Sequence, residues 1–268
     1  MKNIILIILT FILFACKHHE PTNVLRVGTI AGPETELMIA AKKVALHRYG
    51  LHIKVIPFND YMEPNTALYE GDIDANAFQH VPFLRTQNKS RNYHIVAVAK
   101  TFLFPLALYS SSIKTLYQIT PHSKISIPSD PSNERRALLL LQSALLIKLS
   151  HNHHSATIND ITSNPLHLTI LPLDTASLSR TLPDVTAAVI NSNFASVAGL
   201  KIKNALFIET THSPYTNIIA TIPRLARSKK IIELIHAYKS TSVLNKAKLL
   251  FGKNAIPGWP TINNNDKR

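Results

Sequence analysis

The chain has 268 residues, of which 46% are hydrophobic and 17% are charged. This composition supplies enough apolar side chains for a core, so it excludes a wholly disordered protein, and the length suits one large domain or two lobes. Lysine and arginine total 29 against 16 acidic residues, which gives a formal net charge of +13. The basic residues are scattered and accompany no DNA- or RNA-binding motif, so the charge by itself indicates no nucleic-acid partner.

The N-terminus has the pattern of an export signal that ends at a lipidation site. After Lys2, an apolar run extends from Ile4 to Ala15 with a single threonine inside it. As a helix this run spans about 18 Å, which is short of the roughly 30 Å of a bilayer core. The only cysteine, Cys16, follows in the tetrapeptide Leu-Phe-Ala-Cys, which resembles a bacterial lipobox. We therefore predict a signal peptide over residues 1–15, acylation of Cys16 and a tether over residues 16–23.

The prediction for Cys16 also determines where the protein is expected. An acylated mature protein would be lipid-anchored to the cell membrane and face the periplasm or the cell exterior. It would contain no internal disulfide, so its core alone would have to stabilise the fold. The alternative for Cys16 is a buried free thiol.

Beyond this segment, strand and helix patterns alternate along the chain. The predicted strands cover residues 25–30, 51–58, 73–76, 94–99, 104–109, 124–128, 167–173, 185–190 and 217–222. The predicted helices cover residues 34–49, 81–92, 133–148, 227–240 and 242–251, with a further helix opening at Pro64. Ser132 is the predicted N-cap of the helix over 133–148. Because there are too many strands for one small sheet, we predict an α/β fold with two lobes, each a mostly parallel sheet flanked by helices.

Catalytic motifs are absent from the sequence. It has no Gly-x-Ser-x-Gly elbow, no His-Glu-x-x-His and no Walker loop, and only seven glycines. Three histidines, His151, His153 and His154, share a polar loop in which no acid or cysteine completes a metal-binding set. We therefore predict a protein that is not an enzyme and that has neither cofactor nor metal site. The enzymatic alternative is a hydrolase that uses His80 with a serine.

Polar and aromatic side chains cluster near the ends of the predicted strands. The segments are FNDY at 58–61, DANAFQH at 74–80, DPSNERR at 130–136, INSN at 190–193 and SPYTN at 213–217. Because open parallel sheets bind ligands beyond the carboxyl ends of their strands, these segments can converge on one cleft. Arginine, asparagine and aromatic rings suit a zwitterion with an apolar side chain, since arginine binds a carboxylate bidentately.

Five longer segments, taken together, point to a known family. They are FNDYMEPN at 58–65, GDIDANAFQH at 71–80, IPSDPSNERRALLLL at 127–141, AAVINSNFA at 187–195 and SPYTNII at 213–219. From about residue 25 to residue 259 the chain resembles the methionine-binding lipoproteins of ABC importers, the MetQ/NlpA family. The resemblance implies a two-lobed periplasmic-binding-protein fold that closes on free methionine and delivers it to an importer permease and its ATPase. Two departures, Val81 in place of a common lysine and a histidine-rich loop over 150–155, concern partner contacts more than the ligand.

The resemblance also implies which residues hold the charged groups of the ligand. Arg136 would bind the substrate carboxylate, and Asn191 and Asn217 would hydrogen-bond the amino and carboxylate groups. The alternative for Arg136 is a cation on the helix surface beside Arg135.

An aromatic wall for the thioether is implied in the same way. Tyr61, Phe78 and His80 would enclose the sulfur, with sulfur–ring contacts of about 0.3–1.5 kcal/mol. The alternatives are core aromatics for Tyr61 and Phe78 and a hydrogen-bonded scaffold histidine for His80. Asn65 and Asn193 are expected to be helix caps or turn residues.

The polypeptide is expected to cross from one lobe to the other near residues 101–106 and 211–215. Lobe 1 would then comprise residues 24–104 and 216–268, and lobe 2 residues 105–215. Methionine would stabilise the closed state by contacting both lobes. D-methionine, a methionine-containing dipeptide and another apolar amino acid remain alternative ligands. A surface adhesin or sensor lipoprotein without a transport role is the alternative function.

Overall fold

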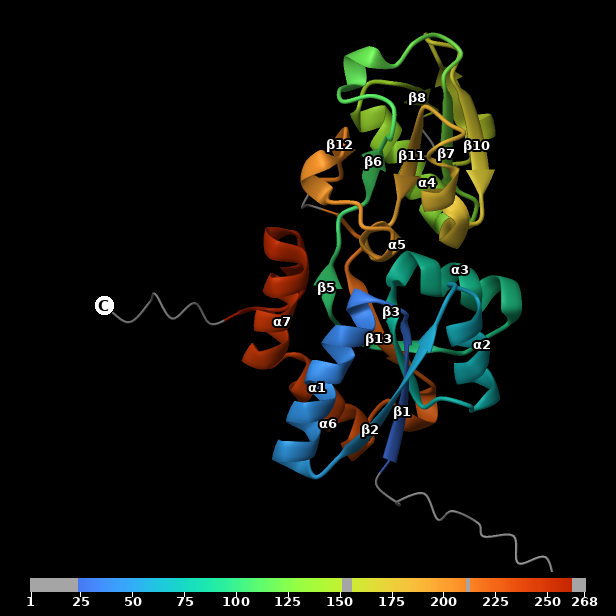
Figure 1. Ribbon diagram of the computed structural model, residues 1–268. Helices are drawn as coiled ribbons and strands as arrows, with labels where there is room; N and C mark the ends of the chain where they lie inside the picture. The colour runs from blue at the N-terminus through green and yellow to red at the C-terminus, as the bar shows by residue number, and fades with distance from the viewer. Residues whose placement is uncertain (1–23, 151–155, 211–212, 262–268) are drawn as a thin grey trace, which may run out of the picture.

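The computed structural model describes residues 24–150, 156–210 and 213–261 as two lobes, each built around a five-stranded sheet (Figure 1). The strand order is β2-β1-β3-β13-β4 in the first sheet and β10-β7-β11-β6-β12 in the second. In each sheet the first three strands are parallel and the last two are antiparallel to their neighbours. The predicted fold class is therefore confirmed, whereas the predicted signal peptide, Cys16 and the loop over 151–155 lie outside the described residues.

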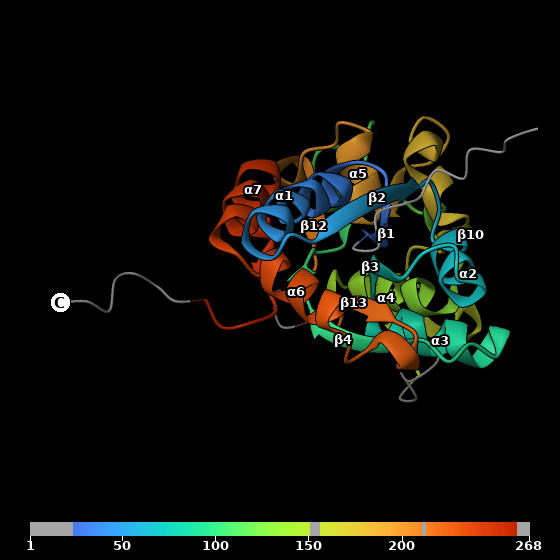
Figure 2. The same ribbon diagram turned by 90° about the horizontal axis from the view of Figure 1, so that it is seen from below.

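The first lobe is formed by both ends of the described chain. Its strands are β1 (Val24–Ile30), β2 (His52–Phe58), β3 (Ala75–His80), β4 (Val96–Lys100) and β13 (Asn217–Thr221). Its helices are α1 (Pro33–Tyr49), α2 (Glu63–Glu70), α3 (Val81–Arg91), α6 (Lys229–Tyr238) and α7 (Thr241–Phe251). One core packs α1, α6 and α7 against the sheet, and a second packs α2 and α3, so helices cover both faces (Figure 2).

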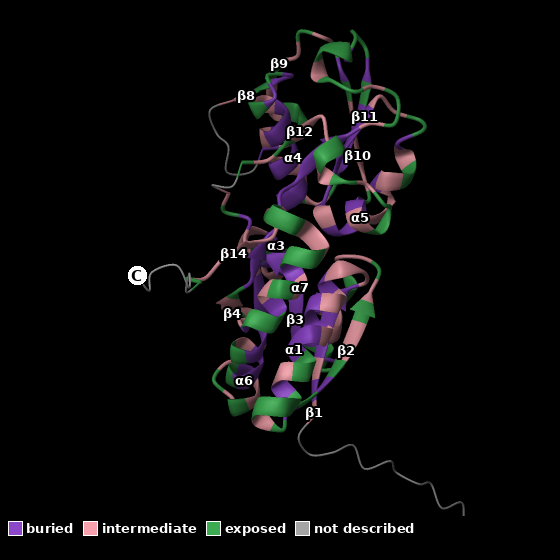
Figure 3. Cartoon of the chain, turned by 60° about the vertical axis from the view of Figure 1, so that its left-hand side comes forward, coloured by how far each residue is buried: buried purple, intermediate pink, exposed green. Residues whose placement is uncertain are grey.

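The second lobe comes from the middle of the chain. Its strands are β6 (Ala107–Tyr109), β7 (Lys124–Pro128), β10 (Thr169–Leu173), β11 (Ala187–Ile190) and β12 (Phe207–Ile208). Its helices are α4 (Pro131–Ser143) and α5 (Ser192–Val197). Two short antiparallel pairs complete the structure, β5 (Phe102–Leu103) with β14 (Ile256–Pro257) and β8 (Lys148–Leu149) with β9 (Ile161–Ser163). In both lobes the central strands, such as β3 and β11, are buried, whereas the edge strands β2 and β10 are partly exposed (Figure 3).

The chain passes between the two sheets twice. The first connection joins β4 to β6 and the second joins β12 to β13. The predicted lobe boundaries, after residues 104 and 215, fall inside these connections, and their positions stay a prediction. None of the described helices is long and apolar enough to cross a membrane.

The prediction that a strand ends at residue 76 was wrong. β3 runs from Ala75 to His80, so Phe78 and His80 lie within the strand and not beyond it. All six residues of β3 are buried, because the sheet is covered on both faces. A strand of this kind lacks the alternation of polar and apolar residues by which an exposed strand is recognised.

The helix predicted over 133–148 has different ends. Its N-cap is Asp130 and not Ser132, because the Asp130 carboxylate accepts a hydrogen bond from the backbone N–H of Asn133 at 3.0 Å. The helix ends at Ser143, and Leu145 beyond it takes a left-handed φ of 61° with its side chain 88% exposed. The apolar run that suggested a longer helix therefore includes a turn, and the polypeptide continues into β8.

Candidate functional site

A cavity lies between the two lobes. The boundary between two lobes or domains is a common place for a small-molecule site. The first lobe contributes Glu34, Tyr61, Phe78, Gln79, His80, Phe83 and Asn217, and the second contributes Asn133, Arg136, Asn191, Ser192 and Asn193. Phe104, in the first connection, completes the lining. All six residues predicted to bind ligand thus line one cavity, and their contacts with a ligand stay a prediction.

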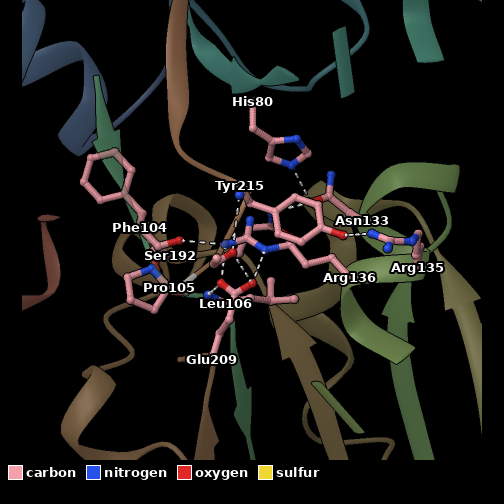
Figure 4. A network of polar contacts seen from close by, with 12 residues as sticks. His80, Phe104, Pro105, Leu106, Asn133, Arg135, Arg136, Ser192, Glu209 and Tyr215 are labelled. Atoms are coloured by element: carbon pink, nitrogen blue, oxygen red, sulfur yellow. Dashed lines mark hydrogen bonds and ion pairs between the residues drawn. The ribbon is translucent and has the colours of Figure 1, made fainter. Parts of the chain in front are cut away.

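Arg136 is held in place by hydrogen bonds from Nε and Nη2 and by an aromatic ring that lies over its guanidinium. Its side chain projects from α4 and is 4% exposed, so it is not the surface cation that the alternative interpretation expected. Nε donates to Glu209 Oε1 at 2.9 Å, and Nη2 donates to Glu209 Oε2 and to the carbonyl oxygen of Phe104 at 3.0 Å (Figure 4). The ring of Tyr215 lies 4.7 Å from Cζ. Among the described residues Nη1 has no hydrogen-bond partner, so one donor of the fork is left for a ligand.

His80 is a neutral, buried hydrogen-bonding residue. Its Nδ1 accepts from the backbone N–H of Phe83 at 3.1 Å, which caps the N-terminus of α3. Nε2 therefore carries the proton and donates to Asn133 Oδ1 at 3.4 Å. Burial, and after it the positive charge of Arg136, lowers the pKa of His80 to about 3. His80 thus has the scaffold role of the alternative interpretation while its side chain also lines the cavity.

Tyr61 joins the two lobes across the cavity. Its hydroxyl donates to Asn193 Oδ1 at 2.7 Å, and its ring centroid lies 5.8 Å from that of Phe78 and 5.1 Å from that of Phe194. Burial raises the pKa of Tyr61 well above its usual value, so the hydroxyl remains a donor at neutral pH. With the His80–Asn133 bond, this contact shows the lobes in a closed arrangement.

Buried polar atoms without partners gather at this cavity. Within the described residues, five buried side-chain nitrogen or oxygen atoms make no hydrogen bond, and three of them belong to lining residues. They are Glu34 Oε2, Asn191 Oδ1 and Asn193 Nδ2. An unsatisfied buried group costs about 1–3 kcal/mol. A ligand that offers both hydrogen-bond donors and acceptors would remove this cost.

Sequence reasoning missed several lining residues. Asn133 lies in a segment singled out as polar, and its Oδ1 accepts from both His80 and Asn191, the latter at 3.1 Å. The sequence did not mark Glu34 as a binding residue, because acidic residues are favoured in the first turn of helices in general. Asn193, expected to be a turn residue, lines the cavity. Asn65 lies behind it in a buried amide network with Gln79, at 2.8 Å, and it is not a helix cap.

The lining residues suit an organic zwitterion better than a metal ion. Within the described part of the chain, no three side chains of His, Cys, Asp or Glu are grouped so that they could hold a metal ion. The polar groups are five amides, one guanidinium, one carboxyl group, one imidazole and the hydroxyls of Ser192 and Tyr61, and the remaining wall is aromatic. Such a site binds and orients a small molecule through both its charged and its apolar parts.

Comparison with known proteins gives the family. The model of the NlpA lipoprotein family matches residues 25–259. The chain belongs to the NlpA lipoprotein family. One similar protein is the D-methionine-binding lipoprotein MetQ of Escherichia coli strain K12. It is 42% identical over 241 residues, which cover 88% of this chain and 89% of that protein.

Solved structures agree with the NlpA assignment. A periplasmic substrate-binding protein of an ABC transporter from Coxiella burnetii is 51% identical with a TM-score of 0.85, and the match covers 87% of this chain and 99% of that one. A nutrient binding protein from Burkholderia cenocepacia, solved bound to methionine, is 43% identical with a TM-score of 0.86. That match covers 88% of this chain and 100% of that one. The two-lobed architecture of this chain is thus that of periplasmic substrate-binding proteins.

Proposed function

We propose that this NlpA-family lipoprotein captures methionine between its two lobes and delivers it to an ABC importer. The observation that carries the proposal is the cavity between the lobes that all six predicted ligand-binding residues line. In it a guanidinium and aromatic rings lie together with amide atoms that have no partner among the described residues. Free methionine has the matching parts, a carboxylate, an ammonium and a thioether chain. The names of the relatives, which bind methionine or serve ABC transporters, support the same ligand class.

The polar end of the ligand would be bound mainly by the second lobe. Arg136 would donate from Nη1 to the carboxylate, and Asn193 Nδ2 is a second donor without a partner. The family resemblance implies that Asn191 and Asn217 hydrogen-bond the amino and carboxylate groups, and their side-chain oxygens would take hydrogen bonds from the amino group. Because Asn217 Nδ2 already donates to Glu34 Oε1 and to the carbonyl oxygen of Phe78, its free side-chain atom for the ligand is the oxygen.

The thioether would lie against the aromatic wall of the first lobe. Tyr61, Phe78 and His80 supply this wall, and sulfur–ring contacts of about 0.3–1.5 kcal/mol favour methionine over a plain aliphatic chain. With groups from both lobes on one ligand, binding would stabilise the closed arrangement. In this scheme residues 24–104 and 216–268 move against residues 105–215.

The proposed role places the protein at a membrane and involves no reaction. Acylation of Cys16 would anchor the mature chain, facing the periplasm or the cell exterior, close to the permease and its ATPase. Relatives are named as binding proteins and lipoproteins, which supports capture and delivery without catalysis. A surface adhesin or sensor is the second candidate, but it has no need of a closed cavity with unpartnered polar atoms.

Calorimetric titration tests the proposal. The chain from Lys17 onward is refolded to remove carried-over ligand and titrated with L-methionine, D-methionine and a methionine-containing dipeptide. We expect one-to-one binding of L- or D-methionine with a dissociation constant in the micromolar range or tighter. Asn191→Ala should weaken it, whereas Tyr117→Ala, at a residue 99% exposed and remote from the cavity, should not. No heat with any of the three ligands would favour the adhesin or sensor.

A further inference from the structure

Glu34 is a buried carboxyl group in the cavity to which the preceding scheme gives no role. It lies in the first turn of α1, is 5% exposed and lines the cavity. Its Oε1 accepts from Asn217 Nδ2 at 3.0 Å, and among the described residues its Oε2 has no partner. One oxygen is therefore fixed on the scaffold of the first lobe, and the other is buried with an unused hydrogen-bonding capacity.

No described side chain neutralises a negative charge on Glu34. Arg136 lines the same cavity but is ion-paired with Glu209. Lys246 of α7 pairs with Glu36, which lies two residues further along α1 and is about half exposed. Burial, and after it the charge of Glu34, raises the pKa values of the phenols of Tyr61 and Tyr238. A phenol is neutral when protonated, so neither tyrosine supplies a positive charge. Burial likewise raises the pKa of Glu34 itself to about 8.

Glu34 also lies where the lobes meet. Gly32, just before α1, takes a φ of 110°, and a Cβ atom there would come within 2.6 Å of Val197 Cγ2 in α5. The N-terminus of α1 thus abuts the helix whose N-cap is Asn191. Asn191 Oδ1 is the second acceptor of the cavity that has no partner within the part of the chain that the structure describes. Two acceptors without donors, one from each lobe, suit a group that carries several N–H bonds and a positive charge.

We propose that Glu34 binds the α-ammonium group of the amino-acid ligand through Oε2 and so selects ligands with a free amino group. This inference rests on the proposed capture of an amino acid. The ammonium supplies the positive charge that the buried carboxylate lacks, and the carboxylate becomes the ionised partner of a desolvated cation. Ligands whose nitrogen is missing or acylated would leave Glu34 without a partner and would bind weakly.

The test compares methionine with 4-(methylthio)butanoate, which is methionine without its amino group. Both are titrated calorimetrically into the wild-type chain and into Glu34→Gln, whose amide keeps an oxygen for Asn217 but carries no charge. We expect the wild type to prefer methionine at least 100-fold, and Glu34→Gln to reduce this preference at least tenfold. The affinity of the variant for 4-(methylthio)butanoate should stay within threefold of wild type, which a general disruption of the site would not allow.

Matched controls make the outcomes separable. Glu36→Gln removes an acidic residue from the exposed side of the same helix and should keep the wild-type preference. A preference for methionine that is the same in Glu34→Gln as in wild type overturns the inference. So does a wild type that binds both compounds equally, and this result needs no variant to fold. If the wild type binds neither methionine enantiomer nor the analogue, the proposed capture of methionine itself is wrong.

Discussion

The ion pair between Arg136 and Glu209 allows stability and binding to be separated. Replacing Arg136 with methionine leaves Glu209, whose side chain is 13% exposed, without its cation, and leaves the carbonyl oxygen of Phe104 without that donor. Breaking a mostly buried pair in this way costs about 3–5 kcal/mol. We expect the free energy of unfolding of Arg136→Met, measured in urea without ligand, to fall by about this amount.

A double variant tests the role of the guanidinium in binding. Arg136→Met/Glu209→Gln contains no unpaired charge, so it should recover part of the lost stability. The ligand carboxylate would still enter a cavity without a cation, which should weaken methionine binding by about 3–5 kcal/mol, or two decades and more in dissociation constant. Calorimetric titration with L-methionine measures this loss.

Arg135, the neighbour of Arg136 on α4, provides the control. Arg135→Met removes the neighbouring cation, which lies outside the cavity lining, and should keep methionine affinity within about threefold. If the double variant is folded and binds methionine within threefold of wild type, the assignment of the ligand carboxylate to Arg136 is wrong. If the single variant is as stable as wild type, the Glu209 pair is not buried as described.

Three further perturbations probe the lining. Tyr61→Phe removes the hydroxyl that donates to Asn193 and should weaken methionine binding by about 0.5–1.5 kcal/mol in calorimetry; unchanged affinity would mean that closure does not need this bond. The pKa of His80 is about 3 in the folded state against about 6.5 unfolded, so the unfolded chain takes up the proton first and stability falls as the pH drops from about 6.5 toward 3. His80→Gln should reduce this fall, which is measured as the free energy of unfolding in urea at several pH values. The same pH dependence of that free energy in the variant and in wild type would contradict the prediction. Gly32→Ala places a Cβ 2.6 Å from Val197 Cγ2 at a positive φ and should lower the melting temperature, which an unaltered thermal transition would disprove.

The sequence allowed the fold class to be predicted because both lobes repeat a local pattern. Strand and helix signals alternate from β1 onward, and the helix predicted over 34–49 is α1, Pro33–Tyr49. The strand order could not be obtained from such signals, since β13 pairs with β3 and β4 across more than a hundred residues. The end of α4 was missed for a local reason, because an apolar run hides the turn at Leu145.

The six residues predicted to bind ligand line one cavity, and their contacts with a ligand stay a prediction. They lie in polar or aromatic segments that could be singled out in the sequence, and the family resemblance implied which residues to choose. Glu209 and Glu34 could not be recognised, because their roles depend on partners distant in the sequence, Arg136 in one case and Asn217 in the other. Their burial is a property of the assembled lobes and is not encoded in any short pattern.

The position of β13 has a consequence for the order in which the chain folds. Among the described strands of the first sheet, β4 pairs with β13 alone, so residues 96–100 have no strand partner until residues 217–221 have been made. The second sheet, by contrast, is complete once Ile208 is available, because all its strands lie between Ala107 and that residue. A chain that emerges from its N-terminus can therefore finish its middle lobe first and close the outer lobe around a late strand. Asn217, the first residue of that strand, is the last lining residue in chain order, so the cavity is complete only after most of the chain has been made.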